Sequence, residues 1–208
     1  MRTSFRTSQR NDNHDSNHAS NHASNPVHCA MLGDGMIGKT SLTLSYSTNH
    51  FNDEYTATML DSYEVAVHND GQHFILSVQD TAGQSDFEDL RTLTYKDSEV
   101  LVLCFSVCDR DSFNNIFTSW IPEIKRHTRR RRPIILVGTQ TDMRTGCLDS
   151  EVTQEEGRAM AKLVGAVTYV ECSAKNRSGL HDVFCNVLGI AMRRRKRKNS
   201  FLGRLFQR

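Results

Sequence analysis

The feature that most constrains the fold is a glycine-rich stretch, Gly33-Asp34-Gly35-Met36-Ile37-Gly38-Lys39-Thr40. It follows a short apolar run, Val27–Leu32, and it opens a segment, Lys39–Thr48, that has the pattern of a helix. In this setting the glycines let backbone N–H groups surround a phosphate, and the helix N-terminus adds partial positive charge. The stretch therefore predicts a phosphate-binding loop, in which Lys39 reaches the terminal phosphates and the Thr40 hydroxyl ligates Mg²⁺. Taken alone, it leaves ATP and GTP both open.

The rest of the chain alternates between strand and helix patterns. A hairpin signal, Asn69-Asp70-Gly71, lies between two alternating runs, and two continuous apolar runs are typical of strands buried on both faces. We expect strands over Ser62–Val67, His73–Val78, Val100–Val107, Ile134–Val137 and Thr168–Glu171, and helices over Asp111–Arg126, Thr153–Val164 and Gly179–Arg195. This order predicts a doubly wound α/β sheet, which binds ligands at the carboxyl ends of its strands.

A second motif, Asp80-Thr81-Ala82-Gly83-Gln84, follows the expected strand His73–Val78. An aspartate at a strand end near a phosphate loop holds magnesium through water, so we assign that role to Asp80. The Gly83 N–H can sense a γ-phosphate, and the Gln84 amide can orient an attacking water. The motif predicts a nucleoside triphosphatase in which Lys39, Gly83 and Gln84 are the catalytic candidates.

Composition divides the chain into three parts. Residues 1–25 are rich in Ser, Asn and His and are expected to be disordered, because they hold too few apolar side chains to offset the entropy of ordering. Residues 26–192 form the expected domain, and residues 193–208 form a basic tail. The six cysteines lie mostly in apolar runs without C-x-x-C pairs, which favours reduced thiols in a cytoplasmic protein. No apolar run approaches the ~20 residues of a membrane span.

Together the motifs resemble the Rho/Rac branch of the Ras-like small GTPases over about residues 27–192. The resemblance rests on the phosphate loop, Glu54-Tyr55, Thr58, the Asp80–Gln84 motif and Glu171-Cys172-Ser173-Ala174. Further matching segments are Ser41–Tyr46, Phe105-Ser106, Ser112-Phe113, Trp120, Pro122-Glu123 and Ile134–Thr139. The resemblance implies the P-loop GTPase fold, an α/β architecture with a mostly parallel six-stranded sheet and helices on both faces.

The family pattern assigns further roles. Phe51 matches an aromatic that stacks on the base, Tyr55 a tyrosine that closes over the phosphates, and Thr58 a threonine that joins Mg²⁺. Residues 51–63 and 82–98 match the two switch segments, which GTP and Mg²⁺ order and hydrolysis releases. The resemblance implies a monomer that meets exchange factors, GTPase-activating proteins and effectors through these segments. Its output would be actin organisation, cell polarity or membrane traffic, with no specific nucleic-acid partner.

Guanine specificity in this family comes from a carboxylate that accepts two hydrogen bonds from the base. The matching segment is Thr139-Gln140-Thr141-Asp142, in which Gln140 replaces the usual lysine. Loss of that lysine is worth ~1–3 kcal/mol of nucleotide binding, so we expect fast exchange. The loop Ser173-Ala174-Lys175 matches the one that contacts the base from the other side, and Lys175 is a candidate to compensate in part.

Three functions remain open. The leading one is a GTP-hydrolysing switch, because Gly35 and Gln84 keep the residues that hydrolysis requires in the family. The second is a nucleotide-binding scaffold with fast exchange and little useful hydrolysis, which Gln140 favours. An ATP-dependent enzyme is the third, and Asp142 together with Ser173-Ala174-Lys175 counts against it.

The chain departs from the family pattern in several places. Ala57 stands where a proline is usual, Gln79 stands where tryptophan is common, and an insert of about a dozen residues between Asp142 and Thr153 is mostly missing. Both substituted positions commonly face partners, so the usual exchange factors and effectors cannot be assumed. The run Arg129–Arg132 favours a solvated loop over contact with acidic lipid or protein.

The tail predicts attachment without a prenyl group. The final residues, Leu205–Arg208, contain no cysteine, so we expect no prenylation box and an atypical member of the family. Six consecutive basic residues, Arg193–Lys198, precede Phe201, Leu202, Leu205 and Phe206 at helical spacing. This pattern favours an anionic membrane surface over a nuclear import signal or a merely solvated tail. We therefore expect a cytoplasmic protein held peripherally at membranes, with the nucleus as the alternative location.

Overall fold

The computed structural model describes residues 25–52, 57–128, 131–146 and 150–205, of which 201–205 are described as backbone only. The expected N-terminal extension therefore lies almost wholly outside the described residues. Tyr55 and the first half of the Arg129–Arg132 run lie outside them as well.

The described strands form one six-stranded sheet with the order β2-β3-β1-β4-β5-β6. All neighbours pair parallel except β2 and β3, which form an antiparallel hairpin. The strands are β1 (Val27–Leu32), β2 (Leu60–Asn69), β3 (Gln72–Thr81), β4 (Val100–Ser106), β5 (Ile134–Thr139) and β6 (Thr168–Glu171). The mostly parallel six-stranded sheet expected from the sequence is confirmed.

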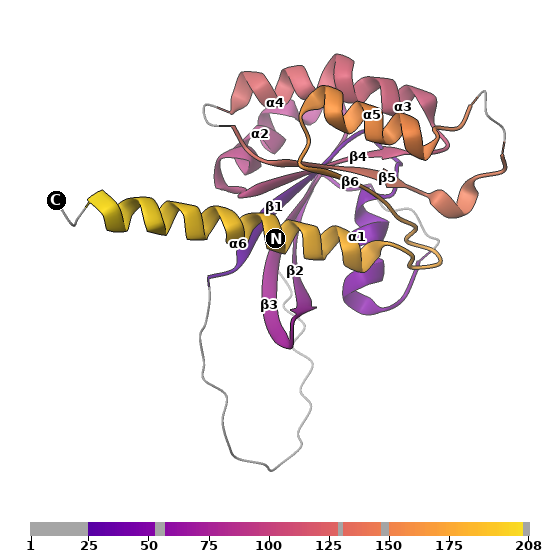
Figure 1. Cartoon of the computed structure of the whole chain (residues 1–208). Coiled ribbons are helices and arrows are strands. Elements are labelled where there is room, and N and C mark those ends of the chain that lie inside the picture. Colours follow the sequence, from indigo (N-terminus) through magenta and orange to yellow (C-terminus); the bar gives the residue numbers. More distant parts are fainter. Residues whose placement is uncertain (1–24, 53–56, 129–130, 147–149, 206–208) are drawn as a thin grey trace, which may run out of the picture.

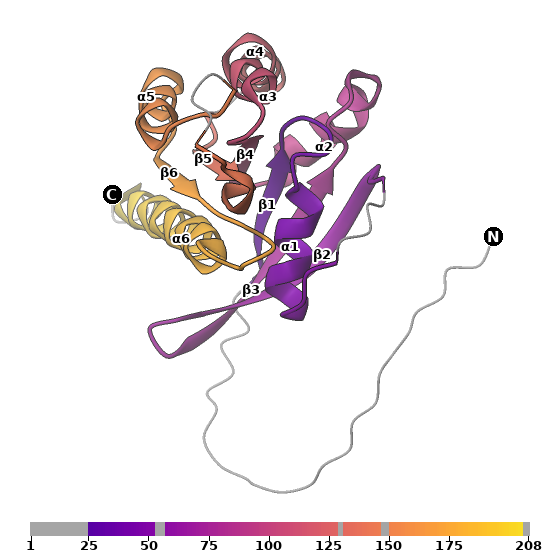
Figure 2. The ribbon, with the colours of Figure 1, turned by 90° about the vertical axis from the view of Figure 1, so that its right-hand side faces the viewer.

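Helices cover both faces of this sheet, as Figures 1 and 2 show. On one face lie α1 (Lys39–Thr48) and α6 (Leu180–Leu205). On the other lie α2 (Glu88–Asp97), α3 (Arg110–Asn115), α4 (Ile121–His127) and α5 (Gln154–Val164). Short 3₁₀ turns occur at η1 (Ser85–Phe87) and η3 (Thr141–Met143).

The core consists of two apolar layers, one on each face of the sheet. Along β1, Cys29 and Met31 join the layer under α1 and α6, whereas Ala30 and Leu32 join the opposite layer. This alternation follows from the two-residue period of a strand. The central strands β4 and β5 are buried along their whole length, which explains their continuous apolar sequences.

The hairpin turn forms where the sequence predicts it. Asp70 and Gly71 both have positive φ angles, +49° and +72°, as a two-residue turn between twisted strands requires. The two strands extend past the expected bounds by one to three residues at each end, because the register continues from Asn69 opposite Gln72 to Leu60 opposite Thr81.

Two helices differ from their expected bounds. The helix expected over Asp111–Arg126 is divided by a π-helical stretch, η2 (Ile116–Trp120), which lies between α3 and α4. The final helix, expected to end at Arg195, continues to Leu205 into the segment assigned to a separate tail. Among the described residues, none of the helices has the length and apolar content needed to cross a lipid bilayer.

Candidate nucleotide-binding site

The phosphate loop joins β1 to α1 at the carboxyl end of the sheet. Gly33 has φ +129°, and a Cβ there would lie 2.2 Å from the carbonyl oxygen of Cys104, so a side chain does not fit. Gly38, at the start of α1, has φ +89°. The loop curls around the buried Lys39 side chain, whose Nζ donates to the carbonyl oxygens of Gly33 at 2.8 Å and Asp34 at 2.5 Å. Burial lowers the pKa of Lys39.

Three oxygen-bearing side chains meet beside this loop. The Thr40 hydroxyl donates to Asp80 Oδ2 at 2.5 Å and lies 2.8 Å from the Thr58 hydroxyl oxygen. Asp80 is fully buried, and its Oδ1 has no hydrogen-bond partner among the described residues. Burial raises the pKa of Asp80, although the Thr40 hydrogen bond and the Lys39 charge oppose the shift. Two hydroxyls and a carboxylate with a spare oxygen fit Mg²⁺, which prefers oxygen ligands.

Gly83 lies directly against the phosphate loop. A Cβ at this position would come within 2.4 Å of backbone atoms of Asp34 and Gly35 and 2.6 Å of the Gly33 oxygen. Glycine is therefore required here by close backbone approach. By contrast, a Cβ at Gly35 would meet nothing within 4 Å. A methyl group at Gly35 would therefore contact no neighbouring atom, in contrast to one at Gly83.

The predicted residues surround two adjoining hollows. The first has a volume of about 160 Å³ and is lined by the phosphate loop, Thr58 and the segment Thr81–Gln84. The second, about 230 Å³, is lined by residues expected around the base, among them Phe51, Asp142, Ala174 and Lys175. The two share Gly38, Ser41 and Gln140 as lining residues, so they form one cleft.

Backbone and side-chain contacts hold the base end of the cleft together. The Thr139 hydroxyl at the end of β5 donates to the Ile37 oxygen at 2.6 Å, which joins this strand to the phosphate loop. The exposed carboxylate of Asp142 accepts a hydrogen bond from the Ser173 hydroxyl through Oδ1. Asp142 therefore keeps an oxygen available toward the second hollow.

Gln140 occupies the position of the missing lysine and still reaches the phosphate loop. Its Nε2 donates to the Met36 carbonyl oxygen at 3.2 Å, and its backbone adopts φ +60°. A Cβ on Gly38 would lie 3.8 Å from this side chain. The neutral amide thus provides one bridge across the loop, without the positive charge of a lysine.

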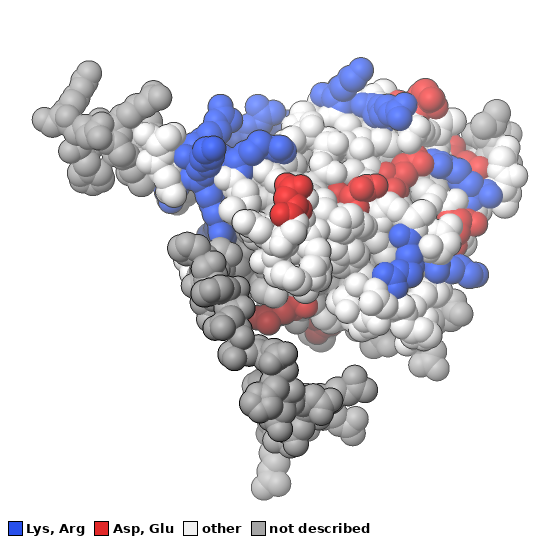
Figure 3. Space-filling view, turned by 60° about the horizontal axis from the view of Figure 1, so that its bottom comes forward, with Lys and Arg blue, Asp and Glu red and all other residues white. Residues whose placement is uncertain are grey.

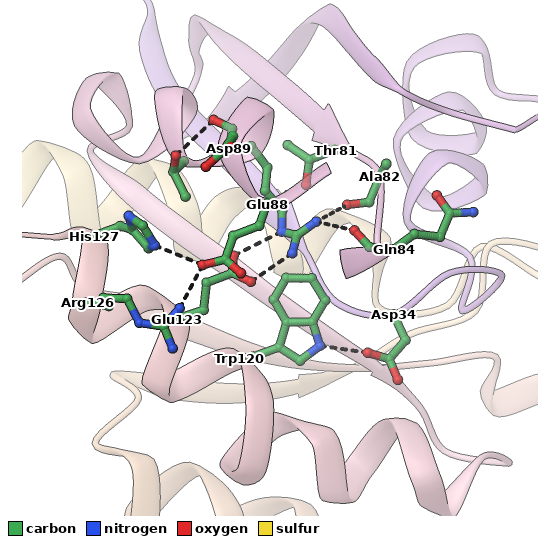
Figure 4. Close-up of polar contacts among 12 residues, drawn as sticks. Asp34, Thr81, Ala82, Gln84, Glu88, Asp89, Trp120, Glu123, Arg126 and His127 are labelled. Carbon is green, nitrogen blue, oxygen red and sulfur yellow. Dashed lines mark hydrogen bonds and ion pairs between the residues drawn. The ribbon is translucent and has the colours of Figure 1, made fainter. Parts of the chain in front are cut away.

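Sequence reasoning missed the residue that fixes the loop after β3. Arg91 of α2 donates through Nη1 to the carbonyl oxygens of Ala82 and Gln84, at 3.1 and 2.6 Å, on either side of Gly83. Its other nitrogens form a buried bidentate pair with Glu123 of α4, at 2.9 and 2.7 Å. Figure 4 shows Ala82, Gln84 and Glu123, the residues that these contacts join, with dashed lines for the hydrogen bonds. In the sequence, Arg91 is a single arginine in a polar helix, and nothing in the pattern indicates that it binds the loop after β3.

The same arginine contacts a second group of residues that reaches the phosphate loop. Its guanidinium lies over the Trp120 ring, 4.9 Å from the centroid. The Trp120 Nε1–H donates to Asp34 Oδ1 at 2.7 Å, and Asn115 Nδ2 donates to Asp34 Oδ2 at the same distance. The wider π-helical turn brings these residues, five apart, toward one side of the helix. The sequence indicates Trp120 and Glu123 only as positions that resemble the family pattern, without these contacts.

Of the two substituted positions beside the switch segments, one forms a polar pair and the other is exposed. Gln79 Nε2 donates to the Ser62 hydroxyl across the hairpin at 2.9 Å, so a polar pair stands where the family commonly has an aromatic. Ala57 is exposed. The Ala82 N–H donates to the Met59 oxygen at 3.0 Å, which joins the two switch segments.

Hydrogen bonds close the segment after Asp142, where the Rho/Rac resemblance predicts an insert. Within residues 144–146 and 150–153, the described parts of this segment, no helix is present. Glu151 accepts hydrogen bonds from the Thr145 and Gly146 N–H groups, and Arg144 forms a bidentate pair with Glu171 at 2.7 Å for both contacts. The five described cysteines are all free thiols.

A comparison with protein-family models agrees with this geometry. The model described as the Ras family matches residues 28–193, which include the phosphate loop, both switch segments and the base end of the cleft.

Proposed function

The chain belongs to the Ras family, and from that premise we propose that it is a Rho-like small GTPase that hydrolyses GTP slowly as a molecular switch. Ras-like GTPases bind GTP and GDP, generally with Mg²⁺. One observation carries the proposal. A single cleft joins the phosphate loop and the Asp142 carboxylate, and the buried carboxylate of Asp80, with one oxygen that lacks a partner, accepts a hydrogen bond from the cleft-lining Thr40. This is the arrangement that a guanine nucleotide with its metal ion requires.

The cleft residues divide the work of binding and hydrolysis. Thr40, Thr58 and Asp80 would hold Mg²⁺, which supplies positive charge to the β- and γ-phosphate oxygens. Lys39 and the loop N–H groups bind the phosphates, and the Gly83 N–H meets the γ-phosphate. Gln84, whose exposed side chain lines the cleft, orients water for attack on the γ-phosphorus as the bond to the β-phosphate oxygen breaks.

The Rho-like assignment rests on the combination of motifs described above, and it places the output in actin organisation, cell polarity or membrane traffic. Effectors, exchange factors and GTPase-activating proteins would bind residues 51–63 and 82–98. No arginine finger matches within the chain, so intrinsic turnover should be on the order of 10⁻⁴ to 10⁻³ per second and rise with an activating protein.

The proposed location is the cytoplasm, peripherally at membranes through residues 193–208, with the nucleus as the alternative. Exposed basic side chains at the end of α6 support membrane attachment. Arg193, Lys196, Arg197 and Lys198 are all exposed. Each is worth ~1 kcal/mol near an anionic surface.

The deciding experiment measures bound nucleotide, its exchange rate and GTP turnover on the purified chain. We expect co-purified guanine nucleotide, slow turnover, and turnover reduced at least tenfold in Gln84→Leu with nucleotide binding retained. Turnover in Gln84→Leu equal to that of the wild type would overturn the assigned role. Copurified adenine nucleotide would overturn the guanine assignment.

A second candidate, a nucleotide-binding scaffold that cycles little, is favoured by the single hydrogen bond from Gln140 to the phosphate loop. It predicts rapid exchange with no turnover above the Gln84→Leu background. The same measurements separate the two functions.

A further inference from the structure

A strongly basic groove lies away from the nucleotide cleft. Its volume is about 860 Å³, and it lies between the segment that leads into β5, the turn after α5 and the later turns of α6. Six of its lining residues are basic: Arg131, Arg132, Arg193, Arg194, Lys196 and Arg197. The other lining residues are Pro133, Gly165, Val167 and Ile190, so no acidic residue among those described lines it.

Four of the six basic side chains that line this groove form no ion pair with a carboxylate of the described residues. Among the described residues, no carboxylate forms an ion pair with Arg131, Arg193, Lys196 or Arg197. Arg194 donates to the carbonyl oxygen of Glu99 at 3.1 Å, which leaves the Arg194 charge in place.

The carboxylate of Glu99 already forms an ion pair. It pairs with Arg195, a neighbour on α6 that does not line the groove. The Glu99 carboxylate therefore holds α6 through Arg195, a residue outside the groove lining.

Concave clusters of like charge focus the electrostatic potential and concentrate counter-ions. Arginine guanidinium groups bind phosphate oxygens in pairs, and this groove presents five arginines and one lysine. Its volume falls within the usual range of small-molecule sites, ~300–1,000 Å³. These properties fit a compact ligand that carries several phosphates better than a single carboxylate.

The direction of α6 indicates where such a ligand comes from. Figure 3 shows the basic side chains gathered where this helix leaves the domain. The helix continues to Leu205, and positions 201, 202 and 205 are apolar residues at helical spacing. One helix thus contributes basic side chains to the groove and then apolar positions suited to a lipid interface.

We propose that this groove binds the multiply phosphorylated headgroup of an inositol lipid in a membrane. The inference rests on the membrane attachment proposed above and adds a headgroup site to it. Arg131 and Arg132, far from α6 in sequence, provide the part of the site that a linear basic tail cannot. We therefore expect a preference for clustered phosphates over the same total charge spread across single-charge headgroups.

The test compares two double variants of the full chain. Arg131→Gln/Arg197→Gln removes two charges from opposite sides of the groove. Arg158→Gln/Lys198→Gln removes two exposed charges that do not line it, one of them on the same helix. Binding is measured by co-sedimentation with vesicles of phosphatidylcholine alone, with phosphatidylserine, or with a bisphosphorylated inositol lipid at equal headgroup charge.

We expect the wild type and the control variant to prefer the inositol-lipid vesicles by roughly tenfold, and the groove variant to lose that preference. Equal weakening of both variants would overturn the site in favour of bulk charge. Binding of soluble inositol hexakisphosphate without any vesicle binding would overturn the lipid source.

Nucleotide exchange and thermal unfolding are measured on the same samples, because they separate this inference from the proposed switch. Normal exchange with no vesicle binding would overturn membrane attachment and the groove site alone. Lost exchange with the lipid preference intact would overturn the switch alone.

Discussion

At the scale of single residues, Gln140 is the position from which we expect the largest effect on nucleotide binding, because the family resemblance predicts a lysine there. The amide reaches the Met36 oxygen at 3.2 Å, so the bridge to the phosphate loop persists while the charge beside the nucleotide is gone. We therefore expect the glutamine to bind the nucleotide more weakly than a lysine would, while its hydrogen bond to the phosphate loop remains.

Restoring the charge should slow nucleotide release. Gln140→Lys adds a charge-assisted hydrogen bond worth ~1–3 kcal/mol, so the GDP dissociation rate should fall roughly 5- to 150-fold. Release of a fluorescent GDP analogue measures this rate. Gln140→Ala, which removes the existing bridge, should accelerate release. An unchanged rate in the lysine variant would sink the idea that this position loosens binding.

Asp80 Oδ1, which has no hydrogen-bond partner among the described residues, leads to a second prediction at this scale. Asp80→Asn removes the carboxylate charge, so stripping Mg²⁺ with a chelator should no longer speed GDP release, whereas it should do so at least tenfold in the wild type. The matched control is Asp61→Asn, the exposed residue directly opposite on β2. Retained chelator sensitivity in Asp80→Asn would contradict the metal site.

At the scale of elements, α2 and α4 are joined through a buried ion pair. Arg91→Met leaves Glu123 buried without its partner, which should lower the free energy of unfolding by ~3–5 kcal/mol. Arg91→Met/Glu123→Met should recover much of the loss, because the unpaired charge is gone. Urea unfolding measures both. A double variant no more stable than the single one would show that the ion pair is not the cause.

A second ion pair joins β6 to the loop after β5. Burial opposes ionisation of Glu171, but hydrogen bonds from Arg144 and Tyr169 outweigh it and hold the pKa below its ordinary value of 4.5. Since the folded pKa is the lower one, the stabilisation is present above pH 4.5 and is lost as the pH falls through the folded pKa. The melting-temperature difference between wild type and Glu171→Gln should therefore shrink under acid. A constant difference from pH 7 to pH 3 would contradict this assignment.

The elements were largely predictable because their signals are local. The conformation of the phosphate loop, of the Asp70-Gly71 turn and of β4 follows in each case from the residues of that segment alone. The π-helical stretch could not be predicted in this way, because it depends on tertiary contacts. Asn115 and Trp120 both donate hydrogen bonds to Asp34, which is more than 80 residues away in the sequence. Arg91 was missed for the same reason, since its partners lie on other elements.

At the scale of the whole molecule, Arg195 joins α6 to two distant segments. It pairs with Glu99 just before β4 and donates to the backbone oxygens of Asn25 and Pro26, both at 2.7 Å. Arg195→Gln should release the end of α6 while leaving the nucleotide cleft intact. The pair is partly exposed, so its loss is worth ~1 kcal/mol, or about fivefold in amide exchange of the last turns.

Hydrogen exchange by mass spectrometry measures this effect, and Arg193→Gln is the control because no carboxylate pairs with Arg193 among the described residues. GDP release should be unchanged in both variants. Equal exchange in the two variants would show that Arg195 does not hold the helix.

Because α6 is continuous, it also influences the orientation that the domain would adopt on a membrane surface. The helix begins beside the Ser173 loop at the cleft and passes Glu99, at the amino-terminal end of β4, before it leaves the domain. Its last ten residues extend about 15 Å as a stiff rod. On a bilayer such a rod would restrict tumbling and turn the switch segments outward. A large regulator would then approach from the aqueous side, with little steric hindrance from the lipid.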